Sequence, residues 1–119
     1  MKDFMVHSRS VEDVAVIYPQ GYLNNIVGEK LEKECRDYMR KGVNKIVLNF
    51  GQTEFINSIG ISILLGIIET LKKSEGTLCF TGMKAPHREI FDMLGLTKYA
   101  MVFTTEDDAL RHFKVEIGK

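Results

Sequence analysis

The sequence predicts an α/β fold, in which a mixed central sheet of about four to five strands is flanked by about four helices. Three observations lead to this fold class. The chain has 119 residues, 45% of them hydrophobic, as expected of one globular domain. Short β-leaning runs alternate with segments of helical apolar spacing. The segments between the later runs are long enough for helical crossovers, which join parallel strands. We therefore expect residues 1–119 to form a single domain.

The chain opens with a predicted β-hairpin. Residues 4–11 and 14–18 are both β-leaning, and only Glu12 and Asp13 separate them. A connection this short joins antiparallel strands, whereas the later crossovers favour parallel ones. The sheet should therefore be mixed.

The first predicted helix follows Gly21-Tyr22-Leu23. Asn24 and Asn25 are both good N-cap residues, because a side-chain oxygen can accept a hydrogen bond from a free backbone N–H. Gly42 marks the end of the helical pattern. Apolar residues recur at helical spacing between these points: Val27, Leu31, Cys35, Tyr38 and Met39. This pattern predicts an amphipathic helix with a charged outer face.

The middle of the chain predicts a buried strand and a second helix. Residues 45–50 form a compact apolar run, typical of a strand covered on both faces. The helix should begin at Asn57 or Ser58 and extend to about Ser74. It is apolar nearly all round, through Ile59, Ile61, Ile63, Leu64, Leu65, Ile67, Ile68 and Leu71.

The last third continues the alternation. Residues 77–81 and 99–103 are predicted strands, and between them Pro86 begins a short helix that Gly95 should end. Thr105, with an acidic residue three positions later, resembles a capping box that opens a final helix through Phe113. The predicted order is β-β-α-β-α-β-α-β-α.

Charge and composition argue against several classes of partner. Sixteen basic residues balance sixteen acidic ones, so no net field attracts nucleic acid or an anionic membrane. The longest apolar stretch, residues 59–68, is about half the length needed to span a bilayer, and residues 1–4 do not resemble a signal peptide. Cys35 and Cys79 are expected to be buried free thiols, as in a reducing compartment. We therefore predict a cytoplasmic protein without membrane insertion.

The sequence offers little for catalysis. His7, His87 and His112 fall on three separate elements and have no carboxylate or cysteine at metal-ligand spacing. No phosphate-binding loop, dinucleotide-binding turn or nucleophile elbow is present. We expect no enzyme activity, no cofactor and no metal, and we expect the domain to act by binding another protein.

The segment from Phe50 to Ile61 is the strongest functional candidate. It joins a central strand to an apolar helix, whose front Asn57 or Ser58 can cap. Gly60 in the first turn costs about 1 kcal/mol of helix propensity relative to alanine. That cost makes sense if another backbone or a partner approaches closely, although Gly60 is also compatible with ordinary packing.

This segment resembles the signature of the STAS domain family, and specifically of the anti-sigma factor antagonists. Residues 55–62 correspond to the family's Phe-(Ile/Met)-Asp-Ser-(Ser/Thr)-Gly-Leu-Gly motif. Residues 21–24 resemble its turn before the first helix, and residues 43–49 its central strand. Residues 90–96 resemble its late (Leu/Ile)-Phe-x-x-x-Gly-(Leu/Phe) motif, and residues 103–110 its closing segment. The resemblance covers nearly the whole chain.

The resemblance implies a regulatory function in bacterial transcription. Such proteins bind an anti-sigma factor, usually a serine kinase with a histidine-kinase-like ATPase fold, and so free a sigma factor. The kinase phosphorylates the hydroxyl residue just before the motif's glycine, which adds about 1.5–2 negative charges at the binding surface. The expected partner is therefore a protein, with self-association into a homodimer left open.

The chain departs from the family at the switch position. Ile59 stands where the phosphorylated hydroxyl would be, and Asn57 replaces the preceding aspartate. Three alternatives follow. Ile59 acts as an apolar anchor without switching, which we favour; Ser58 takes the phosphate; or Ser62, one turn further along the helix, takes it.

The expected partner-binding residues are Asn24, Asn57, Ser58, Ile59, Gly60 and Ile61. An alternative is an accessory STAS subunit of an ABC-type lipid transporter or of a stress-signalling assembly, since such subunits often lack the phosphorylated hydroxyl. A small enzyme with Ser58 as nucleophile is less favoured because no base can be named. Nucleotide binding at the helix front is also ranked low, because the loop lacks the expected glycines.

Overall fold

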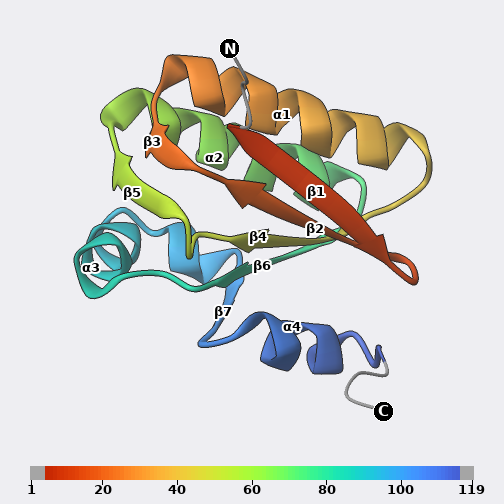
Figure 1. Ribbon diagram of the computed structural model, residues 1–119. Helices are drawn as coiled ribbons and strands as arrows, with labels where there is room; N and C mark the ends of the chain where they lie inside the picture. Colours follow the sequence, from red (N-terminus) through yellow and green to blue (C-terminus); the bar gives the residue numbers. More distant parts are fainter. Residues whose placement is uncertain (1–4, 116–119) are drawn as a thin grey trace.

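The computed structural model describes residues 5–115 and shows a mixed five-stranded sheet with helices on both faces (Figure 1). The strands are β1 (Val6–Val11), β2 (Val14–Pro19), β3 (Gly21–Leu23), β4 (Lys45–Asn49), β5 (Thr53–Ile56), β6 (Thr77–Thr81) and β7 (Met101–Phe103). The helices are α1 (Asn25–Arg40), α2 (Ser58–Lys73), α3 (Ala85–Met93), the 3₁₀ turn η1 (Leu96–Lys98) and α4 (Glu106–His112). The predicted fold class is confirmed.

The main sheet has the strand order β1-β2-β4-β6-β7. The β1–β2 hairpin is antiparallel, and each later neighbour pair is parallel. The central strands β2, β4 and β6 carry nearly continuous buried apolar runs, because helices cover both faces of the sheet. The mixed character predicted from the hairpin and the crossovers is therefore present.

Two apolar clusters lie on opposite faces of this sheet. Alternate residues of β2 show the division: Ala15 and Ile17 join the larger cluster with α1, α2 and α3, whereas Val14 and Val16 join the smaller one with α4. Strand side chains alternate between faces, so one buried strand supplies both clusters. Figure 1 shows α1 and α2 on one side of the sheet and α4 on the other.

Most predicted helix starts are correct. Asn24 caps α1, Asn57 caps α2, and the Thr105 hydroxyl caps α4 by accepting a hydrogen bond from the Asp108 backbone N–H at 3.1 Å. Pro86 lies in the first turn of α3, and Gly95 follows that helix with a positive φ of 83°. Cap chemistry therefore located these boundaries to within a residue or two.

Three predicted boundaries need correction. Residues 21–23 and 53–56 were expected to be turn and loop, but they form β3 and β5, which pair in a separate two-stranded sheet. The last strand begins at Met101 and not at residue 99, because η1 and its turn occupy the preceding residues. The predicted first strand began at Phe4, which lies outside the described residues.

Candidate functional site

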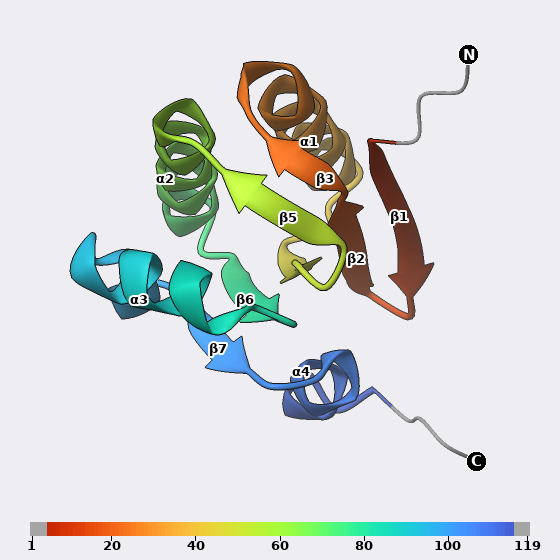
Figure 2. The ribbon, with the colours of Figure 1, turned by 60° about the vertical axis from the view of Figure 1, so that its left-hand side comes forward.

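β3 and β5 place the fronts of α1 and α2 side by side. The two strands pair in parallel, with Leu23 opposite Ile56, and each leads directly into a helix (Figure 2). The Asn57 backbone N–H donates a hydrogen bond to the Leu23 carbonyl oxygen at 3.2 Å. The structure therefore brings together the two predicted parts of the site, the Asn24 turn and the front of α2.

Both cap side chains are engaged in holding these helix fronts. The Asn24 Oδ1 atom accepts hydrogen bonds from the backbone N–H groups of Ile26, at 3.0 Å, and Val27, at 3.1 Å. The Asn57 Oδ1 atom accepts one from the Gly60 N–H at 2.8 Å. Asn57 therefore caps α2 with an uncharged side chain.

Gly60 is buried where α2 meets the end of β3. A Cβ atom built at Gly60 would lie 2.3 Å from the Leu23 carbonyl oxygen, far inside van der Waals contact. Sequence reasoning left open whether a partner protein or another backbone segment required a glycine here. The structure shows that the β3 backbone of the same chain lies against Gly60 and leaves no room for a side chain.

Replacing Gly60 with alanine is therefore expected to lower the free energy of unfolding by about 2–3 kcal/mol, because overpacking forces backbone shifts. Urea unfolding followed by circular dichroism measures the loss. Gly66→Ala is the matched control on the same helix: nothing lies within 4 Å of its added Cβ, so it should stabilise by up to about 1 kcal/mol. Equal stability of the two variants would contradict the close approach at Leu23.

The predicted binding residues of α2 differ in what they present to solvent. Ser58 and Ser62 are exposed, and the Ile59 side chain is 48% exposed. Gly60 and Ile61 are buried, and Ile61 belongs to the larger core cluster. Ile59 is therefore the only one of the two first-turn isoleucines that can offer substantial side-chain area to a partner.

Three further exposed apolar side chains lie on the elements that form the two helix fronts, and sequence reasoning missed them. Tyr22 on β3 is 49% exposed, Phe55 on β5 is 64% exposed, and Ile26 in the first turn of α1 is 52% exposed. The Tyr22 and Phe55 rings contact edge to face with centroids 6.1 Å apart. We call Tyr22, Ile26, Phe55 and Ile59 the helix-front patch. Exposed apolar residues gathered in this way mark interaction surfaces.

Residues at the start of α3 form hydrogen bonds to the backbone of β5, the strand that carries Phe55, and to the turn before it. The Lys84 Nζ atom donates hydrogen bonds to the backbone oxygens of Thr53, at 2.8 Å, and Gly51, at 3.4 Å. The buried His87 ring hydrogen-bonds the backbone of Glu54, whereas its Nδ1 atom has no partner among the described residues. Burial, together with the nearby Lys84 charge, lowers the pKa of His87 below its usual value.

This lowered pKa predicts a pH dependence of stability. Between the ordinary pKa of about 6.5 and the lower folded pKa, the unfolded chain binds more protons at this position than the folded chain. The contribution of neutral His87 is thus complete above about pH 6.5 and is lost as the pH falls below that value. We expect wild-type protein to lose more stability than His87→Gln between pH 7.5 and 5.5 in urea unfolding. An equal loss in both proteins would contradict the assignment.

The described residues were compared with the requirements of a metal site, a reactive thiol and a membrane span. Residues 5–115 contain no group of three or more His, Cys, Asp or Glu side chains that could hold a metal ion. Cys35 and Cys79 are free and buried, as predicted, and burial raises the pKa of each thiol to about 12. Within the same part of the chain, no helix is long and apolar enough to cross a membrane.

Comparison with known proteins gives one family. Residues 6–109 match the family model described as STAS domain. The chain is 26% identical over 109 residues to BtrV of Bordetella bronchiseptica, a protein named provisionally as an anti-sigma factor antagonist; the match covers 92% of this chain and 94% of BtrV.

Solved structures show the same fold. A Thermotoga maritima protein named provisionally as an anti-sigma factor antagonist superposes with a TM-score of 0.84 at 21% identity, covering 93% of this chain and 96% of the other. SpoIIAA from Bacillus, solved in its phosphorylated form, gives a TM-score of 0.74 at 23% identity, covering 91% and 98%. At these identities, the likeness establishes the fold alone.

Proposed function

Because this chain belongs to the STAS domain family, we propose that it is an anti-sigma factor antagonist, which binds an anti-sigma factor through the helix-front patch and so frees a sigma factor. The relative BtrV carries this function in its provisional name. The observation that carries the proposal is the exposure of Ile59, in the position next to Gly60 where the family's switch residue stands.

The chemistry of the patch suits a protein partner. Aromatic residues are enriched at the centres of protein interfaces, and Tyr22 and Phe55 offer two rings that already contact each other. Ile59 adds a branched aliphatic side chain at the front of α2, where the cap at Asn57 holds the backbone. Little ordering of this surface is needed before binding, which lowers its entropic cost.

We propose that the partner is a serine kinase with a histidine-kinase-like ATPase fold, and that binding is not switched by phosphate at position 59. Isoleucine has no hydroxyl to modify. Ser58 and Ser62 are both exposed, and phosphate on Ser58, the first residue of α2, would be favoured by the helix dipole. Phosphopeptide mapping of protein from its own host should find neither serine phosphorylated to high occupancy. Stoichiometric phosphate on Ser58 would replace the non-switching proposal with a displaced switch.

The direct test is affinity capture from host lysate, followed by reconstitution. We expect capture of an ATPase-fold anti-sigma factor. Adding the purified chain to the purified complex of that factor with its sigma factor should release the sigma factor, as measured by size-exclusion chromatography. Release that fails at a saturating excess of the chain would overturn the antagonist role.

The isoleucine at position 59 also favours a second candidate function. A subunit that remains permanently bound in a transporter or a stress-signalling assembly has no need of a phosphorylated hydroxyl there. The same capture experiment separates the two functions: recovery of permease and ATPase subunits, or of a large signalling assembly, would support the second candidate.

A further inference from the structure

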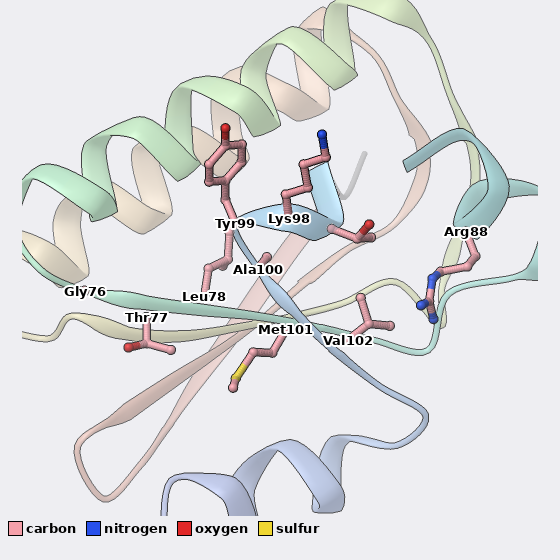
Figure 3. A pocket seen from close by; sticks show the side chains of 10 residues that line it. Gly76, Thr77, Leu78, Arg88, Lys98, Tyr99, Ala100, Met101 and Val102 are labelled. Carbon is pink, nitrogen blue, oxygen red and sulfur yellow. The ribbon is translucent and has the colours of Figure 1, made fainter. Parts of the chain in front are cut away.

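The main sheet ends on one side at β7, which is far in sequence from the helix-front patch. The β6–β7 ladder extends only from Cys79 opposite Met101 to Thr81 opposite Phe103. Among the described residues, the first two residues of β6 therefore have no partner on the β7 side. A hollow of about 500 Å³ lies beside these residues, and β7 is one of the two edge strands of the sheet (Figure 3).

Apolar side chains flank this edge on both faces of the sheet. Tyr99 is 58% exposed and points toward α2, whereas Met101 is 41% exposed and points the opposite way (Figure 3). The Tyr99 ring also borders an adjoining hollow of about 160 Å³ together with Leu65 and Ile68 of α2. We call the two hollows with Tyr99 and Met101 the edge groove. An extended segment presents its side chains alternately to two faces and thus matches this arrangement.

The lining of the edge groove has an excess of basic residues. Three basic side chains border it (Lys72, Arg88 and Lys98), against one acidic side chain, Glu69. The Lys72 Nζ atom lies 5.1 Å from the centroid of the Tyr99 ring, and Lys98 is the last residue of η1. Neither lysine forms an ion pair within residues 5–115. Arg88, by contrast, is already paired with Asp92 at 3.2 Å. With Arg88 paired to Asp92, Lys72 and Lys98 outnumber the single Glu69. In a chain whose basic and acidic residues balance, this local excess of positive charge favours an anionic partner.

We propose that the edge groove binds an extended acidic segment of a partner protein, which adds to the outer edge of β7 as a further strand. Main-chain hydrogen bonds to the edge would provide affinity, as in other strand-addition complexes. Apolar side chains of the segment would alternate between Tyr99 and Met101, and its carboxylates would meet Lys72 and Lys98. A second copy of this chain fits less well, because a two-fold contact at this edge would bring its own lysines together.

The test is selection of peptides from a phage-displayed library of random 12-residue peptides on the purified protein. We expect enrichment of sequences in which apolar residues alternate with Asp or Glu. The enriched peptide, synthesised with a fluorescent label, should bind with an affinity that falls as salt is added. In ¹⁵N spectra its binding should shift the amide signals of Thr77, Leu78, Met101 and Val102.

Charge reversal is the decisive variant. The double substitution Lys72→Glu with Lys98→Glu changes two exposed side chains, so it should fold normally by circular dichroism and weaken peptide binding at least tenfold. Ile59→Glu, in the helix-front patch, should bind the peptide unchanged. The proposal is overturned if no acidic sequence is enriched, if the double variant binds as well as wild type, or if sedimentation shows a dimer that the double substitution dissociates.

This inference stands apart from the proposed function, because the edge groove and the helix-front patch share no residue. The Lys72→Glu, Lys98→Glu protein should still bind the anti-sigma factor. If this folded double variant keeps peptide binding, the edge groove has been assigned wrongly. If it loses anti-sigma factor binding instead, the helix-front patch has been assigned wrongly.

Discussion

Ile59→Glu is expected to weaken binding to the anti-sigma factor by at least about 100-fold while leaving the fold intact. The Ile59 side chain is half-exposed in the first turn of α2 and is one of the four exposed apolar residues of the helix-front patch. Binding would bury the new carboxylate against an apolar surface with no partner for its charge, and such burial is costly. The same carboxylate near a helix N-terminus is mildly stabilising in the free protein.

Isothermal titration calorimetry with the purified anti-sigma factor measures this loss, and circular dichroism checks the fold. Leu65→Glu is the matched control, since Leu65 is an exposed apolar residue of the same helix, 38% exposed, but lies outside the helix-front patch. It should bind within a few-fold of wild type. A folded Ile59→Glu protein with wild-type affinity would place the binding surface elsewhere.

The order of helices and strands could be predicted from residues that act locally, such as helix caps and short apolar runs. Asn24, Asn57 and Thr105 each carry a side-chain oxygen that can accept from a free N–H, and each proved to be an N-cap. The apolar runs of β4 and β6 are compact because both faces of those strands are covered. Information of this kind is local and can be read without knowing the tertiary structure.

The pairing of β3 with β5 could not be read in the same way. β3 has only three residues, and Tyr22 at its centre is exposed, so it shows no alternation over enough positions to predict a strand. Its partner β5 lies some 30 residues further along, and the two meet only because α1 and α2 pack side by side. Long-range pairing of short segments is a property of the tertiary fold.

The site was predicted in part for the same reason. The sequence located the α2 front, but helix geometry decided that Ile59 faces solvent while Ile61, two positions on, faces the core. Tyr22 and Phe55 were missed because their exposure depends on the small sheet. The sequence does show an aromatic residue on each of the two segments that become β3 and β5. That observation indicates a shared surface only once the two segments are known to pair.

Leu64→Asp is expected to unfold the domain at room temperature. Leu64 is fully buried in the larger core cluster, between the sheet and the neighbouring helices. Truncating a buried leucine alone costs about 2–5 kcal/mol, and an unpaired carboxylate adds the penalty of burying a charge. The free energy of unfolding of a small domain is only about 5–15 kcal/mol. The combined cost of the substitution approaches or exceeds that value.

The two residues that flank Leu64 on α2 supply graded controls for this prediction. Leu65→Asp changes an exposed side chain and should fold with nearly wild-type stability. Ile63 is half-buried against Gly28, so Ile63→Asp should be destabilising but less so than Leu64→Asp. Thermal unfolding followed by circular dichroism ranks the three variants. A cooperative transition for Leu64→Asp near the wild-type temperature would mean that α2 does not bury this face, and the orientation that exposes Ile59 in the helix-front patch would then be wrong as well.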